Sequence, residues 1–120
     1  CFWSLMGKLT THILDTSNGI PGAGIALRLF RAGEERELLV STSTNKDGRC
    51  DAPLLADDAF APATYELEFD VAEYFANNTA TVAEPPFLDV ITLRFTISED
   101  SHYHVPLLVS PWSYSTYRGS

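Results

Sequence analysis

His-Tyr-His-Val-Pro-Leu-Leu-Val-Ser, residues 102–110, is the stretch that most clearly indicates the fold. In an extended strand, successive side chains point to opposite faces of the sheet. One of the two resulting sets is large and apolar, which predicts burial in a core: Tyr103, Val105, Leu107 and Val109. The other set is predicted to face away from that core: His102, His104, Pro106 and Leu108.

Similar strand signals recur along the whole chain. Alternation or a β-branched and aromatic composition marks residues 9–14, 25–30, 38–44, 64–69, 89–96 and 113–117. Turn-forming sequences, such as those at residues 17–19 and 45–48, separate these segments. Residues 70–77 differ, because an acidic start and an Asn-Asn end indicate a short helix. We therefore predict an all-β fold, an antiparallel β-sandwich of two sheets with one short helix.

Size and charge narrow the classes of function. A chain of 120 residues is expected to form a single domain, here residues 7–120, preceded by an N-terminal extension at residues 1–6. The net charge of −8 and the scattered basic residues argue against a nucleic-acid partner. No apolar run approaches the ~20 residues of a membrane span, and no signal peptide is evident. Because Cys1 and Cys50 make no disulfide framework, a cytoplasmic location is predicted.

The outward faces of two predicted strands are only partly polar. If Ile13 points into the core, His12 and Leu14 point out of it, just as His104 and Leu108 do on the strand at residues 102–110. A sheet face that mixes leucine with histidine is poor solvent surface and suits an interface or a pocket wall. This pattern favours an oligomer with a site built between sheets of different subunits.

The residues alone leave several kinds of chemistry open. Each histidine could be an ordinary surface residue, and His102 with His104 could contribute to a zinc site, although no cysteine or carboxylate is obviously beside them. A serine triad is disfavoured because the chain has no Gly-x-Ser-x-Gly sequence. A metal-free acid–base site is more plausible. A neutral histidine can accept a proton from water, and Arg49 could stabilise the anion that develops.

Several segments together resemble the transthyretin-related family, and in particular its 5-hydroxyisourate hydrolase branch. They are residues 9–15, 19–23, 44–49, 86–89, 102–111 and 117–120. The terminal Tyr-Arg-Gly-Ser, combined with His-Tyr-His-Val-Pro-Leu-Leu, is the most specific part of this resemblance. The similarity covers nearly the whole chain, from about Gly7 to Ser120.

The resemblance implies a transthyretin-like sandwich that assembles as a homotetramer, a dimer of dimers joined through strand edges around a channel. It also implies a reaction in the route from urate to allantoin. Water opens the ring of 5-hydroxyisourate at an amide bond and gives 2-oxo-4-hydroxy-4-carboxy-5-ureidoimidazoline. No cofactor and no metal are expected.

Carried over by motif, the catalytic residues are expected at His12, Arg49, His104 and Ser120. One histidine would deprotonate water, Arg49 would balance the developing oxyanion, and Ser120 would orient water or substrate. Substrate contacts are expected from the terminal motif and the outward faces: Tyr117, Arg118, Leu14, Pro106 and Leu108. The alternative function is a non-catalytic carrier of a small ligand such as thyroid hormone, which would favour an apolar channel.

Overall fold

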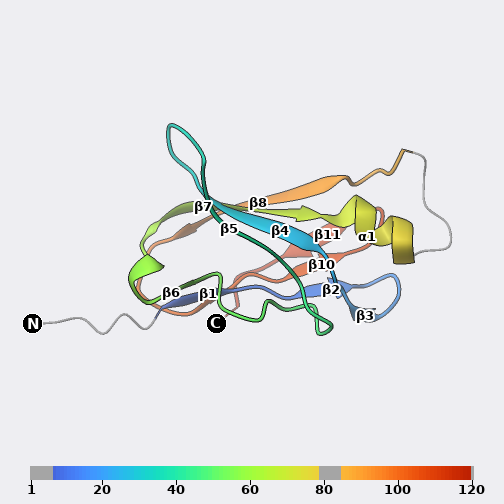
Figure 1. Ribbon diagram of the computed structural model, residues 1–120, viewed down its shortest axis with the longest axis horizontal. Helices are drawn as coiled ribbons and strands as arrows, with labels where there is room; N and C mark the ends of the chain where they lie inside the picture. The colour runs from blue at the N-terminus through green and yellow to red at the C-terminus, as the bar shows by residue number, and fades with distance from the viewer. Residues whose placement is uncertain (1–6, 79–84, 120) are drawn as a thin grey trace, which may run out of the picture.

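The computed structural model describes residues 7–78 and 85–119 of the chain. Its strands lie in two layers, with an α-helix at one end (Figure 1). In chain order the elements are β1 (Lys8–Thr10), β2 (Ile13–Asp15), β3 (Ile20–Pro21), β4 (Ala26–Arg31), β5 (Glu37–Ser43), β6 (Leu55–Ala56), the 3₁₀ turn η1 (Asp57–Ala59), β7 (Ala63–Asp70), α1 (Val71–Asn78), β8 (Val90–Ile97), β9 (Tyr103–His104), β10 (Leu107–Val109) and β11 (Tyr114–Thr116). The predicted β-sandwich with one short helix is confirmed.

One layer is a four-stranded antiparallel sheet in the order β5-β4-β7-β8. Its longest pairing joins β7 to β8, from Ala63 opposite Ile97 to Asp70 opposite Val90. Alternate residues of β7 are fully buried: Tyr65, Leu67 and Phe69. This inward row covers one side of the core, as the alternation in the sequence predicted.

The other layer carries the candidate site and is built from two short sheets that continue one another. Their orders are β6-β1-β9 and β11-β10-β2-β3. The amide of Val105 donates to the Thr10 carbonyl and that of Leu107 to the His12 carbonyl, both over 2.9 Å, so the hydrogen bonds run on between the two sheets. The pairs β1–β9 and β2–β10 are parallel, which makes this layer mixed rather than purely antiparallel.

Two predicted strands are interrupted in the middle. The segment at residues 102–110 forms β9 and β10, which are separated by Val105 and Pro106. Proline has no amide hydrogen to donate to a neighbouring strand, so pairing is weakened there. The segment at residues 9–14 forms β1 and β2, because the neighbour on its outer edge changes from β6 to Arg49, which pairs with His12 as an isolated bridge.

The predicted faces of these strands are largely correct. All four residues assigned to the core are buried: Tyr103, Val105, Leu107 and Val109. On the outward face, His12, Leu14, His104 and Leu108 are half-buried and His102 is exposed. Pro106, in contrast to these residues, is buried. It lies beside the returning C-terminal strand, where the hydroxyl of Thr116 donates to its carbonyl over 2.7 Å.

The helix is fixed by a buried carboxylate. Asp15 at the end of β2 is 1% exposed and accepts a 2.7 Å hydrogen bond from the hydroxyl of Tyr74 in α1. Ser17 and Asn18 also donate to it, through both their backbone amides and their side chains. Burial alone would raise the pKa of Asp15, but these hydrogen bonds hold the pKa below its ordinary value. The network ties the helix to the loop that follows β2.

The described part of the chain also bears on two other sequence-based expectations. In residues 7–78 and 85–119, no helix is long and apolar enough to cross a membrane. Cys50 carries a free, half-buried thiol, and burial raises its pKa. The proposed extension at residues 1–6 lies outside the described residues.

Candidate active site

A tight turn between β5 and β6 brings Arg49 to the site. The side-chain oxygen of Asn45 accepts the amides of Asp47 and Arg49, over 2.9 and 3.2 Å. Gly48 adopts a φ of 76°, a left-handed conformation that glycine tolerates best. The Gly48 carbonyl then accepts the amide of Ile13 over 2.8 Å. The turn is thereby held against the first strand, and Arg49 lies directly opposite His12.

His104 is held from two sides. On one side β9 pairs with β1 in parallel, which places His104 opposite Thr10. On the other side the C-terminal segment returns, and His104 and Gly119 exchange two backbone hydrogen bonds of 3.1 and 2.6 Å. The backbone of this histidine is therefore fixed by segments from the two ends of the chain.

The two half-buried histidines lie close together on the outward face. The ring centroids of His12 and His104 are 6.5 Å apart. Nε2 of His12 donates to the Asp47 carbonyl over 3.0 Å, and no described residue hydrogen-bonds to Nδ1 of that ring. In His104 the arrangement is reversed, because Nδ1 contacts the Thr10 hydroxyl over 2.9 Å and it is Nε2 that has no hydrogen-bond partner in residues 7–78 and 85–119.

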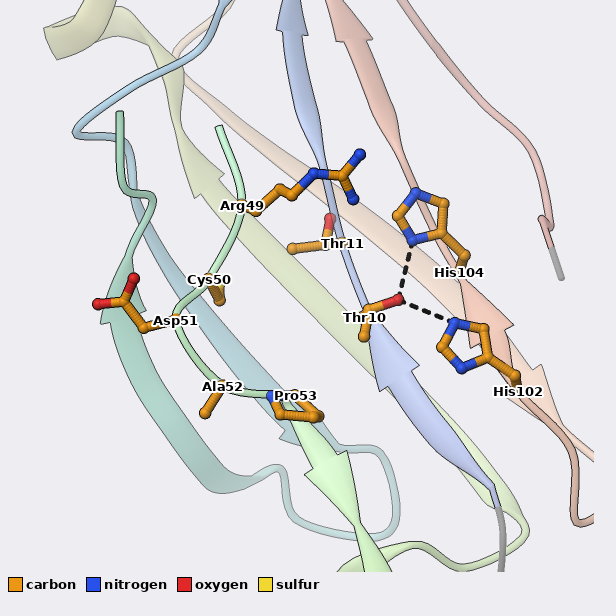
Figure 2. A pocket seen from close by; sticks show the side chains of 9 residues that line it. All are labelled: Thr10, Thr11, Arg49, Cys50, Asp51, Ala52, Pro53, His102 and His104. Atoms are coloured by element: carbon orange, nitrogen blue, oxygen red, sulfur yellow. Dashed lines mark hydrogen bonds between the residues drawn. The ribbon is translucent and has the colours of Figure 1, made fainter. Parts of the chain in front are cut away.

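A pocket of about 500 Å³ opens in front of His104. Figure 2 shows Arg49 extending across Thr11 toward the imidazole of His104. The pocket wall consists of Thr10, Thr11, Arg49, Cys50, Asp51, Ala52, Pro53, His102 and His104. His12 is not part of this wall and adjoins it through His104. A volume of this order accommodates a small heterocycle.

Electrostatics favour neutral imidazoles at this site. Burial is the main cause that lowers the pKa of both His12 and His104 below the ordinary histidine value, and the positive charge of Arg49 is the second. Within residues 7–78 and 85–119, no carboxylate forms an ion pair with Arg49. The site therefore combines two proton acceptors with a cation whose charge is available to an anion.

Other predicted site residues lie apart from the pocket. Leu14 and Leu108 are neighbours across the β2–β10 pairing on the outward face. Pro106 does not line the pocket, because it is buried beside the C-terminal strand. Tyr117 and Arg118 line a different hollow, of about 450 Å³, together with the inward-facing Tyr103. The catalytic position predicted at Ser120 lies outside the described residues.

Arg118 makes contacts that fasten the C-terminal segment. Its guanidinium lies 4.1 Å from the centre of the Tyr103 ring. It also donates to the Ser101 hydroxyl over 3.0 Å and to the His102 carbonyl over 3.4 Å. A longer ion pair of 3.8 Å joins it to Glu99. These contacts hold Arg118 beside the loop before β9, where it lines the second hollow.

Sequence reasoning did not single out Thr10 or the pocket wall at residues 50–53. Thr10 lies two residues before His12, so alternation along a strand would put both on one face, and that was the one signal available. The parallel register that sets Thr10 beside His104 has no signature in a single sequence. In the described ranges, no three His, Cys, Asp or Glu side chains are grouped closely enough to hold a metal ion.

Comparison with known proteins identifies the relatives of this chain. Residues 9–119 match the model of the HIUase/Transthyretin family. A 5-hydroxyisourate hydrolase of Pseudomonas aeruginosa is 53% identical over 117 residues, which cover 96% of this chain and 93% of that protein. The solved structure of Klebsiella pneumoniae 5-hydroxyisourate hydrolase matches with a TM-score of 0.79 at 36% identity, over 96% of this chain and 100% of that one. That of (S)-allantoin synthase matches with a TM-score of 0.92 at 47% identity over 98% of this chain, which spans 45% of that longer chain.

Proposed function

This chain belongs to the HIUase/Transthyretin family, and we propose that it is an enzyme that hydrolyses 5-hydroxyisourate. The proposal is supported by the hydrolase of Pseudomonas aeruginosa, which is 53% identical and aligns over nearly the full length of both chains. The single structural observation that carries it is the meeting of Arg49, His12 and His104 beside one pocket.

His104 is the proposed general base, because it lines the pocket and its Nε2 is available there. Nε2 takes a proton from water as the water oxygen attacks the ring carbonyl carbon of the substrate. The carbonyl oxygen becomes an oxyanion, which the Arg49 guanidinium stabilises. The oxyanion then collapses, the carbon–nitrogen bond of the ring breaks, and the proton on His104 passes to the leaving nitrogen. The product is 2-oxo-4-hydroxy-4-carboxy-5-ureidoimidazoline, and no step uses a cofactor.

His12 and Ser120 are assigned supporting roles in this scheme. His12 pairs with Arg49 through its backbone and is oriented by the Asp47 carbonyl, so it is suited to hold substrate or water beside His104. Ser120 follows Gly119 in the sequence, and Gly119 is bonded to the backbone of His104. Ser120 is therefore proposed to orient water or substrate.

A homotetramer is the proposed assembly. Phe87 precedes β8 and Trp112 precedes β11, at the edges of the two layers; both side chains are exposed, and their rings stack with centroids 6.0 Å apart. These edges are proposed to join two subunits into a dimer. The outward face with Leu14 and Leu108 is proposed to join two dimers, which would enclose the site in a channel and let Leu14 and Leu108 contact the substrate. Sedimentation analysis tests this assembly: Trp112→Ser should weaken the dimer, whereas the equally nonpolar-to-polar change Leu38→Ser on β5 should not.

The decisive test is the ultraviolet absorbance of freshly generated 5-hydroxyisourate, followed with and without the protein. Decay should be faster with the protein, Arg49→Gln and His104→Gln should abolish the acceleration, and EDTA should leave it unchanged. Arg31→Gln is the matched control, because Arg31 pairs with Glu37 on the other layer. A decay no faster than the spontaneous reaction would refute the hydrolase and return attention to a transthyretin-like carrier. A cytoplasmic location stays a prediction.

A further inference from the structure

The hydroxyl of Thr10 contacts two imidazoles at once. Its oxygen lies 2.9 Å from Nδ1 of His104 and 3.3 Å from Nε2 of His102 (Figure 2). Thr10 and both histidines belong to adjacent strand segments, and Thr10 is directly opposite His104 in the β1–β9 register. Within residues 7–78 and 85–119, the hydroxyl of Thr10 is thus the one polar group that links the rings of His104 and the more exposed His102.

The hydrogen-bond chemistry of these groups restricts their arrangement. A hydroxyl has one proton, so Thr10 can donate to only one of the two rings and must accept from the other if both contacts are hydrogen bonds. A neutral imidazole carries its proton on one nitrogen and a lone pair on the other. If His104 is to accept a proton at Nε2, its neutral form must carry the hydrogen on Nδ1. That hydrogen then donates to Thr10, and Thr10 donates to Nε2 of His102.

We propose that Thr10 is a positioning residue that holds neutral His104 in its Nδ1–H tautomer, and that His102 supports it by accepting the Thr10 hydroxyl proton. The lone pair on Nε2 of His104 is then directed to the pocket. This role depends on the proposed function only in that His104 is the base there. His102, the first histidine of His-x-His, then acts as a hydrogen-bond acceptor for Thr10 rather than as an ordinary surface histidine.

The surroundings of His104 give Thr10 a specific task. The charged and titratable groups that act on His104 are Arg49, His12 and His102. Arg49 and His12 are not hydrogen-bonded to the His104 ring, and on its C-terminal side the bonds to Gly119 involve only the backbone. Among the described residues, Thr10 is therefore the one group that hydrogen-bonds to the His104 ring and can determine its tautomer.

The tautomer can be observed directly by nitrogen-15 NMR of the histidine rings at pH 8, without substrate. The wild-type protein should show the hydrogen of His104 on Nδ1. His102→Leu should shift the population toward hydrogen on Nε2, since the Thr10 hydroxyl is then free to donate to His104. A wild-type spectrum with the hydrogen on Nε2 would overturn the proposal, as would a His102→Leu spectrum identical to wild type.

Kinetics on 5-hydroxyisourate provide the second test, with two matched substitutions. Thr10→Val keeps the shape and the β-branched character of threonine but removes the hydroxyl, whereas Thr10→Ser keeps the hydroxyl. Thr10→Val should lower kcat by about tenfold or more, which is less than the about 100-fold or more attributed to a general base because His104 itself remains, with KM changed by less than about twofold. Thr10→Ser should restore most of the rate.

Equal impairment of both Thr10 variants, or full activity of Thr10→Val, would contradict the role of the hydroxyl. The two proposals can fail separately. If the wild-type protein does not hydrolyse 5-hydroxyisourate, the proposed function is lost, while the NMR spectra still decide the tautomer. If Thr10→Val fails to fold, the wild-type and His102→Leu spectra remain sufficient for a decision.

Discussion

Gly48→Ala is expected to damage both stability and activity. At a φ of 76°, alanine adopts a left-handed conformation that costs about 1–2 kcal/mol. The added Cβ would also overlap the carbonyl oxygen of Ile13, which already accepts the amide of Gly22 over 2.8 Å. Relieving such an overlap in a packed region costs about 1–3 kcal/mol more. The total loss in the free energy of unfolding is therefore about 2–5 kcal/mol.

The chain offers a matched control for this substitution. Gly24 has a φ of 74°, but a Cβ there would meet nothing within 4 Å. Gly24→Ala should therefore lose only the conformational part, about 1–2 kcal/mol. Urea unfolding at one fixed protein concentration measures the difference, since the stability of an oligomer depends on concentration.

Activity separates the two glycines further. Moving the turn at residues 45–49 displaces Arg49, and a shift of about 1 Å in a positioned group can lower the rate about 100-fold. Gly48→Ala should thus lower kcat/KM by about this factor, while Gly24→Ala leaves it within about twofold. If the two variants lose the same free energy of unfolding, the overlap with the Ile13 carbonyl contributes nothing to the loss in Gly48→Ala. If they lose equal activity, the turn does not position Arg49.

Further predictions concern charge and hydrogen bonding. Tyr74→Phe removes a donor to the ionised Asp15 and should lower the free energy of unfolding by about 1.5–3 kcal/mol. Tyr65→Phe removes a bond to a neutral carbonyl and should cost about 0.5–1.5 kcal/mol, so equal losses in urea unfolding would refute the special weight of the carboxylate. The lowered pKa of His104 keeps its imidazole neutral below the usual histidine range, so the hydrolysis rate should hold to below pH 6.5 and fall only as pH drops through that lowered pKa. Arg49→Gln removes a nearby positive charge and should raise the pKa of His104 in an NMR titration; an unchanged or lower value would contradict the electrostatic argument. Arg118→Lys should lower kcat/KM several-fold, because it loosens the C-terminal segment. The free energy of unfolding should change by less than about 1 kcal/mol, since the contacts of Arg118 are exposed. Full activity of this variant would contradict the role of Arg118.

How far the sequence predicts this molecule depends on the kind of information required. The period of two assigned Tyr103 to the core and His104 to the outward face, because side-chain alternation is a local property of a strand. The two-residue strands β3 and β6 are too short to show any period. The burial of Pro106 was missed because it depends on the strand that returns alongside it, and no local pattern encodes that neighbour.

At the site, too, the sequence does not predict which strand positions lie opposite one another. Arg49 was assigned to the site only through the family resemblance, since a single arginine after a turn is usually solvated. The structure gives the reason for its placement, because the Gly48 carbonyl accepts the amide of Ile13 and so holds the turn against the first strand. The Thr10–His104 contact joins positions 94 residues apart, and only the register of β1 against β9 brings them together. A shift of that register by one residue would turn every side chain of the strand to the other face.

The site therefore depends on pairing between the two ends of the chain. His12 and Thr10 come from the first strands, whereas His104 and Gly119 come from the last. Arg49 joins them from the middle by pairing with His12. Pairing between distant segments costs loop-closure entropy before its contacts form, so it tends to occur late in folding. A variant that loosens the C-terminal edge can consequently keep the opposite layer, in which β4 and β8 pair with β7, while losing the geometry around His104. This separation explains why changes at Arg118 are expected to affect catalysis more than stability.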